Sequence, residues 1–244
     1  MMRIAIFGAT SAIAEATARQ WAGEEARFFL VGRDETALGD IAADLKARGA
    51  AEVITRQSDL RELDGLAGLC RDAEGALGRI DVALIAHGVL PDQRIVGESS
   101  ELFLDLARIN ALSPGALMIE LRKIMKRQRH GSLVVLSSVA GDRGRPSNWV
   151  YGGAKAMLSV MGEGMGLELD SAGVNVLVVK PGFVDTPMTA DFPKGPLWAS
   201  TDQVAGSIVR AVRTKRRGVL YAPGWWRWIM LVVAFAPDFL VKRL

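Results

Sequence analysis

The sequence contains very few residues that could form covalent cross-links or metal sites. Cys70 is the only cysteine, and there are two histidines among 244 residues. A single cysteine forms no internal disulfide and no cysteine-based metal centre, so disulfide scaffolds, zinc ribbons and iron–sulfur proteins are excluded. We therefore expect a protein of a reducing compartment that carries no metal.

Charge of one sign and long membrane-type segments are also lacking. The 30 basic and 27 acidic residues give a formal net charge of +3, and there is no basic tract with interleaved aromatic residues. This balance gives no support for nucleic-acid binding. A mean hydropathy of +0.19 with 50% apolar residues excludes a disordered chain and a polytopic membrane protein. The apolar stretch at 4–7 is too short for a secretory signal, so a cytoplasmic location is expected.

Short aliphatic runs alternate along the chain with segments of helical periodicity. The predicted strands are residues 3–7, 27–31, 51–55, 80–86, 132–136 and 174–179, and the predicted helices are 11–22, 35–48, 61–76, 99–128 and 150–171. Helical connections of this length make successive strands parallel, with right-handed crossovers. The sequence thus predicts one doubly wound α/β Rossmann domain over residues 1–244, with a mostly parallel seven-stranded sheet and helices on both faces.

The pattern changes after the sixth predicted strand. Four prolines interrupt residues 181–196, which predicts a loop, with 187–200 as a substrate lid. A helix at 201–212 and a seventh strand near 219–221 are expected next. Residues 225–236, which come next, are apolar except for Arg227. Residues 224–244 are therefore predicted to form an apolar C-terminal tail.

The first predicted strand ends in a loop suited to binding phosphate. A doubly wound fold presents backbone N–H groups and the positive end of a helix to a pyrophosphate at this position. The candidate cofactor residues in the turn are Gly8, Thr10, Ser11 and Ile13. Ala12 and Ala14 stand where a G-x-x-x-G-x-G loop has glycine, and their methyl groups narrow the approach to phosphate. A plain strand-to-helix turn is the alternative interpretation.

The end of the second predicted strand indicates which dinucleotide is bound. An acidic side chain here would accept from a ribose 2′-hydroxyl, whereas Arg33 offers a planar cation to a 2′-phosphate. We expect NADP(H) to be preferred, with NAD(H) as the alternative; a solvated Arg33 beside a helix-capping Asp34 is the other interpretation. Further candidate cofactor contacts follow the third and fourth strands: Asp59, Leu60, Ala86 and Gly88. His87 is expected to be a packed loop residue rather than a catalytic base.

A tyrosine and a lysine four residues apart form the strongest chemical motif. Tyr151 and Lys155 share one face of a predicted helix, so the ammonium group can lie near the phenol and lower its pKa. Ser138 ends the fifth strand, where its hydroxyl could bond a substrate carbonyl.

With these residues the chain resembles the classical short-chain dehydrogenase/reductase family, from the loop at Gly8 to Thr186. The resemblance implies a catalytic tetrad of Asn110, Ser138, Tyr151 and Lys155. It implies that the tyrosine is the general acid for reduction, the serine polarises the carbonyl, the lysine contacts the nicotinamide ribose and the asparagine holds a water. Cofactor contacts are implied for Tyr151, Lys155, Pro181, Gly182, Val184 and Thr186, the last two holding the nicotinamide carboxamide.

The sequence departs from the family pattern at one further place, and it has a closer likeness to one group within the family. Residues 86–88 read Ala-His-Gly where the family has Asn-Ala-Gly, which loses an asparagine that ties neighbouring strands. Within the family, the chain is most similar to the reductases of polyprenyl-phosphoryl 2-keto-ribose (decaprenylphospho-erythro-pentofuranosid-2-ulose 2-reductases). This likeness rests on Gly-Ala-Thr-Ser at 8–11, on Trp-Val-Tyr-Gly at 149–152 and on the C-terminal residues from Tyr221 to Leu244.

The tail favours contact with a membrane surface. As a helix, residues 225–236 would span only about 18 Å, less than the roughly 30 Å of a hydrocarbon core, so the tail is not expected to cross a bilayer. Three tryptophans beside Arg227, with basic residues at 213–217 and 242–243, suit anionic headgroups. We expect peripheral contact from Trp225 to Leu244, at the inner face of the cytoplasmic membrane. A buried helix or an oligomer contact is the alternative.

Three functions are compatible with these features. The leading hypothesis is an NAD(P)H-dependent reductase of a ketone on a lipid-linked sugar or another membrane-resident lipid. The second is a reductase of a soluble ketone, with the tail covering the cleft or a subunit interface. The third is a non-catalytic NADP(H)-binding regulator, against which the intact tetrad argues. The resemblance also implies a homodimer or homotetramer.

Overall fold

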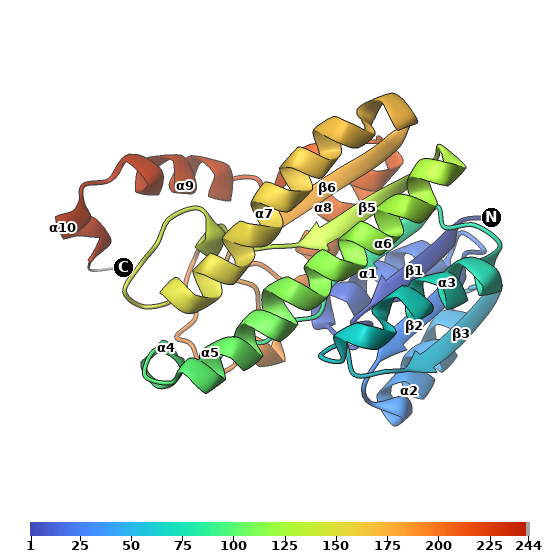
Figure 1. The fold of residues 1–244 in the computed structure, drawn as a ribbon, viewed down its shortest axis with the longest axis horizontal. Coiled ribbons are helices and arrows are strands. Elements are labelled where there is room, and N and C mark those ends of the chain that lie inside the picture. Colours follow the sequence, from blue (N-terminus) through green and yellow to red (C-terminus); the bar gives the residue numbers. More distant parts are fainter. Residues whose placement is uncertain (243–244) are drawn as a thin grey trace.

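The computed structural model describes residues 1–242, in which helices cover both faces of one seven-stranded sheet (Figure 1). The strands are β1 (Arg3–Phe7), β2 (Arg27–Gly32), β3 (Glu52–Gln57), β4 (Val82–Ile85), β5 (Gly131–Leu136), β6 (Val174–Pro181) and β7 (Gly218–Ala222). The longer helices are α1 (Ala12–Ala22), α2 (Glu35–Ala47), α3 (Leu66–Leu77), α5 (Ser100–Ala107), α6 (Ser113–Gln128), α7 (Trp149–Leu169), α8 (Thr201–Arg213) and α9 (Trp226–Phe235). The short helices are α4 (Gln93–Val96) and α10 (Asp238–Val241), with single turns η1 (Leu63–Gly65), η2 (Arg108–Leu112), η3 (Val139–Gly141), η4 (Asp170–Ala172) and η5 (Pro187–Thr189).

The strand order is β3-β2-β1-β4-β5-β6-β7, and every neighbouring pair is parallel. The predicted doubly wound fold is therefore confirmed, and the sheet is parallel throughout rather than mostly so. The strand order reverses between β1 and β4. In folds of this kind, such a reversal opens a crevice at the carboxyl ends of the strands, where ligands bind.

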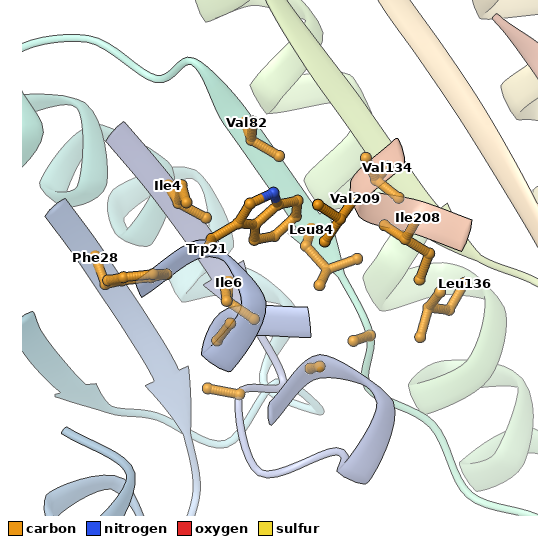
Figure 2. Packing of buried hydrophobic residues seen from close by; sticks show 14 of the residues in the cluster. Ile4, Ile6, Trp21, Phe28, Val82, Leu84, Val134, Leu136, Ile208 and Val209 are labelled. Atoms are coloured by element: carbon orange, nitrogen blue, oxygen red, sulfur yellow. The ribbon is translucent and has the colours of Figure 1, made fainter. Parts of the chain in front are cut away.

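The sheet is buried on both sides, which explains its continuous aliphatic strands. In β1, Ile4 and Ile6 point into one core, while Ala5 and Phe7 point into the other. Trp21 of α1 is fully buried in the first core, between the strands and α8 (Figure 2). The aliphatic side chains of both cores fix the register of the strands whose ends carry the candidate site.

The helical segment predicted at 99–128 is interrupted. A π-helical turn, η2, separates α5 from α6, so the prediction of one regular helix is wrong in detail. The predicted helix at 61–76 also begins later, at Leu66, after a 3₁₀ turn. Within residues 1–242, one stretch, Ser100–Gln128, has the length and apolar composition of a membrane span, but half of its most apolar window is buried in the fold, as in a core helix.

The chain after β6 forms a loop and then a separate helical tail. The loop contains η5, and a bridge between Val184 and Ala199 closes its base; its role as a substrate lid stays a prediction. After β7 the chain enters α9 and α10, which lie apart from the helices that cover the sheet (Figure 1). The last two residues of the predicted tail, 243–244, lie outside the described residues.

Candidate active site

A cavity of about 290 Å³ lies at the carboxyl ends of the strands, on both sides of the reversal between β1 and β4. Ten of the candidate cofactor residues line it: Gly8, Thr10, Ser11, Ile13, Arg33, Asp59, Leu60, Ala86, Gly88 and Thr186. The structure thus brings together residues from four strand ends and from the loop after β6. Their contacts with a cofactor stay a prediction.

The turn at the end of β1 depends on one glycine. Gly8 has φ +87°, and a Cβ there would lie 2.6 Å from the backbone nitrogen of His87, so a side chain is excluded. Ser11 begins α1 without a side-chain capping bond. Of the two alanines that replace glycines, Ala12 lines the cavity, whereas Ala14 is fully buried in the core. Only Ala12 can therefore affect the approach of a phosphate directly.

The two charged residues after β2 have different surroundings. Asp34 caps α2, because its Oδ1 accepts from the backbone nitrogen of Ala37 at 3.0 Å. Arg33 is exposed, and within residues 1–242 its guanidinium forms no ion pair. Arg33 and Asp34 also line a second, open hollow beside Thr10. The carboxylate is thus engaged in the helix cap, while the cation is available at the rim of the cavity.

Ser138, Tyr151 and Lys155 lie together at the ends of β5 and α7. Ser138 begins η3, where its Oγ accepts from the backbone nitrogen of Ala140 at 3.1 Å. Tyr151 lies in the first turn of α7, near enough to Ser138 for the serine hydroxyl to lower the pKa of the phenol. One turn further, Lys155 Nζ donates to the carbonyl of Leu136 at 3.0 Å and lies 5.7 Å from the centre of the Tyr151 ring.

Burial dominates the protonation of this group. It raises the pKa of Tyr151 to about 12, against the smaller lowering effect of the hydrogen bond to Ser138. It also lowers the pKa of Lys155 to about 8. The expected lowering of the Tyr151 pKa by Lys155 is not found, because desolvation of the phenol is the largest cause and raises the pKa.

Asn110 lies in the π-helical turn and is fully buried. Its Nδ2 donates to the carbonyl of Val89, and its Oδ1 accepts from the nitrogen of the same residue, both at 2.8 Å. A Cβ built on Gly88 would lie 2.6 Å from Asn110 Oδ1 and 3.4 Å from Lys155 Nζ. Asn110 and Lys155 therefore both lie next to Gly88, which lines the wall of the cavity.

His87 is packed, as predicted. Its Nε2 lies 3.0 Å from the hydroxyl of Ser113, and burial, assisted by the charge of Lys155, lowers its pKa to about 3. His87 is thus a neutral imidazole on the wall of the cavity, and its expected lack of a catalytic role stays a prediction. Among residues 1–242, no cluster of three or more histidine, cysteine or acidic side chains could hold a metal ion.

The residues expected near the nicotinamide follow β6. Pro181 ends the strand, and the nitrogen of Gly182 donates to the carbonyl of Ala222 at 3.3 Å. The hydroxyl of Thr189 donates to the carbonyl of Val184 at 2.6 Å and accepts from the nitrogen of Thr186 at 3.2 Å. The sequence analysis missed Thr189, although its spacing from Thr186 is that of a capping box.

A buried ion pair near the site was also missed. Lys180 Nζ lies 2.7 Å from Asp142 Oδ1, and the hydroxyl of Tyr221 donates to Asp142 Oδ2 at 2.8 Å. These contacts tie the segment after Ser138 to the ends of β6 and β7. The only signal in the sequence is a lysine near the end of a mostly apolar strand, which does not reveal its partner.

Comparison with known proteins agrees with this architecture. The family model described as short chain dehydrogenase matches residues 3–196. An uncharacterised oxidoreductase of Mycobacterium tuberculosis is 33% identical over 241 residues, covering 99% of this chain and 96% of the relative.

Two solved structures share the fold at low sequence identity. A variant of an actinorhodin polyketide ketoreductase solved with NADPH has a TM-score of 0.82 at 22% identity, covering 92% of this chain and 97% of that one. A short chain dehydrogenase of Mycobacterium paratuberculosis bound to NAD has a TM-score of 0.80 at 21% identity, covering 91% and 96%. By the match to the family model and to its relative, this chain belongs to the short-chain dehydrogenase/reductase family of oxidoreductases.

Proposed function

We propose that this oxidoreductase reduces a ketone to a secondary alcohol with NADPH. The observation that carries the proposal is the grouping of Ser138, Tyr151 and the buried Lys155 near a cavity at the reversal of strand order. The structural neighbours solved with NADPH and with NAD support a nicotinamide cofactor, which when bound would supply the hydride. The left-handed turn at Gly8 and the uncapped start of α1 fit a pyrophosphate.

Tyr151, Ser138 and Lys155 would each have a different part in the acid–base chemistry. With a pKa of about 12, Tyr151 keeps its proton at neutral pH and can donate it to a carbonyl oxygen that gains negative charge. Ser138, which lies close to Tyr151, would donate to the same oxygen. Lys155 brings a cation near the phenol and is fixed by the carbonyl of Leu136, so it stabilises the charge that develops after proton transfer.

Arg33 supports a preference for NADPH over NADH. Its guanidinium is exposed at the rim of the cavity, and no acidic side chain of the described residues neutralises it. Asp34, the nearest carboxylate in sequence, is engaged in capping α2. A ribose 2′-phosphate would therefore meet a free cation, whereas a 2′-hydroxyl would have no carboxylate to accept its hydrogen bond.

The exposed face of the tail supports a substrate that resides in a membrane, such as a lipid-linked sugar ketone. Phe235, Phe239 and Trp228 are 83%, 65% and 65% exposed, and they stand beside the exposed cations Arg227 and Lys242. Aromatic side chains and cations of this kind bind at an anionic lipid surface. The tail would thus bring the catalytic group to the inner face of the cytoplasmic membrane.

The basic segment before β7 does not add to this surface. Residues 213–217 precede the strand, whereas α9 follows it, so the two lie at opposite ends of β7. Arg213 pairs with Glu24, and Arg217 pairs with Asp170. The expectation that these cations flank the tail is therefore wrong, and the lipid contact rests on α9 and α10.

We also propose that the enzyme is a homo-oligomer, because α7 exposes large apolar side chains. Val160 and Leu167 are exposed along this helix, and a second copy of the chain would cover them. Light scattering should give a dimer or tetramer for the purified protein and a smaller particle for Val160→Glu. A monomer in both cases would contradict the proposal.

NADPH oxidation tests the proposed reaction directly. The purified protein should oxidise NADPH in the presence of a member of a ketone panel that includes small diketones and ketones carried on isoprenoid lipids in vesicles. NADPH binding without turnover of any ketone would instead favour the non-catalytic regulator.

Flotation with anionic vesicles tests the membrane contact. The intact chain should float, and a Trp228→Ser/Phe235→Ser/Phe239→Ser variant should remain at the bottom while still binding NADPH. If the intact chain does not float at low salt, the soluble-ketone reductase becomes the better hypothesis.

A further inference from the structure

The helix α9 has one face exposed and one face seated on the segments that carry the candidate site. Trp226 and Met230 are 4% and 2% exposed, whereas Trp228 is 65% exposed. The two buried residues pack with Val139, which follows Ser138 directly in the chain. The tail is therefore in contact with the segment that positions a predicted catalytic hydroxyl.

The second contact of Trp226 is with Gly182. A Cβ built on Gly182 would lie 1.9 Å from both Cε2 and Nε1 of the indole, so the ring lies directly over the glycine Cα. The ring of the neighbouring Phe183 packs edge to face against Trp226, with 5.5 Å between the ring centres, and stacks on Trp198, with 5.4 Å between the ring centres. This indole therefore covers the segment that leads from β6 to Val184.

Other contacts hold α9 in this place. Arg143 donates to the carbonyl of Ala234 at 3.3 Å and pairs with Asp238 at 2.8 Å, which attaches the end of α9 and the start of α10 to the loop after η3. The indole nitrogen of Trp226 has no hydrogen-bond partner in the described part of the chain. The position of the ring is thus set by apolar packing and by the absence of a side chain at Gly182.

From these contacts we propose that Trp226 is a positioning residue for the reaction. Its indole covers Gly182 and belongs to one apolar cluster with Val139, and so it fixes the nicotinamide-side segment 182–184 relative to Ser138. The inference rests on the proposed nicotinamide-dependent reduction, in which hydride and proton must reach the same carbonyl group. Misplacement of reacting groups by about 1 Å can cost on the order of 10²-fold in rate.

Substitutions on the two faces of α9 provide a matched test. Trp226→Ala should lower kcat by about 10- to 100-fold, whereas Val232→Ala, at a position of the same helix that is 72% exposed, should leave kcat and KM for a soluble ketone unchanged. Trp226→Phe should recover most of the loss, because a smaller ring still covers Gly182. A folded Trp226→Ala protein with the kcat of the unsubstituted chain would overturn the proposal.

Cofactor binding separates positioning from general loss of structure and needs no turnover. Fluorescence titration of Trp226→Ala should show weakened binding of NADPH but unchanged binding of 2′-phospho-ADP-ribose, which lacks the nicotinamide. Equal weakening of both ligands would show a merely structural role and overturn the proposal. An unsubstituted chain that binds NADPH yet reduces no ketone would refute the proposed function, and this titration would still test Trp226.

A double substitution examines the contact itself. Gly182→Ala should lower kcat and weaken NADPH binding in the unsubstituted chain, because the new Cβ would meet the indole. In the Trp226→Ala background the space is open, so the same substitution should cost much less. Strictly additive effects would show that Trp226 does not act through Gly182.

Discussion

The two ends of the candidate site are built on different principles. At the dinucleotide end, backbone turns after β1, β2, β3 and β4 shape an open cavity whose rim carries the exposed cation of Arg33. At the proposed catalytic end, Lys155 is held by the carbonyl of Leu136 and lies beside Tyr151, without an ion pair in the described residues. One end presents shape and charge to a ligand, while desolvation shifts the proton affinity of the side chains at the other.

This difference indicates which substitutions each end tolerates. A change at the rim alters the affinity for one ligand, because solvent can replace the lost contact. A change in the buried group alters the protonation or position of a reacting atom, which water cannot replace. The effects of substitution should therefore be larger at the catalytic end, and they should depend on pH there.

The largest effect is expected for Tyr151→Phe. The substitution keeps the ring and its packing but removes the proton that the mechanism transfers. NADPH should still bind, while kcat for ketone reduction should fall by about 10²- to 10⁴-fold. Steady-state kinetics together with NADPH titration check this, and near-normal turnover by the folded variant would remove Tyr151 from the acid role.

Lys155 should show the effect of burial as a dependence of stability on pH. Its pKa is about 8 in the folded chain against an ordinary value of 10.5, so between these values the unfolded chain binds more protons. The free energy of unfolding that Lys155 contributes should therefore rise from about pH 8 to 10.5 and be lowest below pH 8. Urea unfolding of the unsubstituted chain and of Lys155→Met, at a series of pH values, measures the difference.

Two features make this measurement specific. Burial also raises the pKa of the Cys70 thiol, but its contribution is common to both chains and cancels in the difference. Lys46→Met, at an exposed lysine, controls for removal of one positive charge. A difference between the unsubstituted chain and Lys155→Met that stays constant from pH 7 to 10.5 would show that burial does not lower the pKa of Lys155.

Arg33→Ala should have an intermediate effect, confined to the rim. Loss of a charge-assisted contact with the 2′-phosphate should weaken NADPH by about 1.5 to 3 kcal/mol, roughly 10- to 150-fold, and leave NADH almost unchanged. Because the contact is exposed, the loss should shrink at high salt. Titrations with both cofactors at two salt concentrations check this, and equal weakening of NADPH and NADH would show that Arg33 does not read the phosphate.

Much of the fold and of the candidate site follows from local patterns. The aliphatic run at 3–7 becomes β1 with the same bounds, because buried parallel strands need apolar residues on both faces. Tyr151 and Lys155 meet because helical periodicity places residues four apart on one face. Both the strand and the Tyr151–Lys155 motif can be predicted because they depend only on residues close together in the sequence.

The parts that could not be predicted depend on contacts between distant segments. The raised pKa of Tyr151 results from burial by the assembled fold, and spacing along the chain contains no measure of burial. The pairing of Lys180 with Asp142 and the seat of Trp226 on Gly182 join residues from different elements. The break between α5 and α6 likewise accompanies the contact of Asn110 with Val89.

The smallest effect is expected at the alanines that replace glycines in the first turn. Ala12 lines the cavity at the start of α1, so Ala12→Gly should remove a methyl group from the path of the phosphates and tighten NADPH binding a few-fold. Ala14 is buried inside the helix, so Ala14→Gly should leave binding unchanged but destabilise the fold by about 1 kcal/mol or more. NADPH titration and urea unfolding of both variants distinguish these outcomes. If Ala12→Gly leaves the affinity unchanged, the methyl group does not limit the approach, and the cavity already admits the pyrophosphate as it stands.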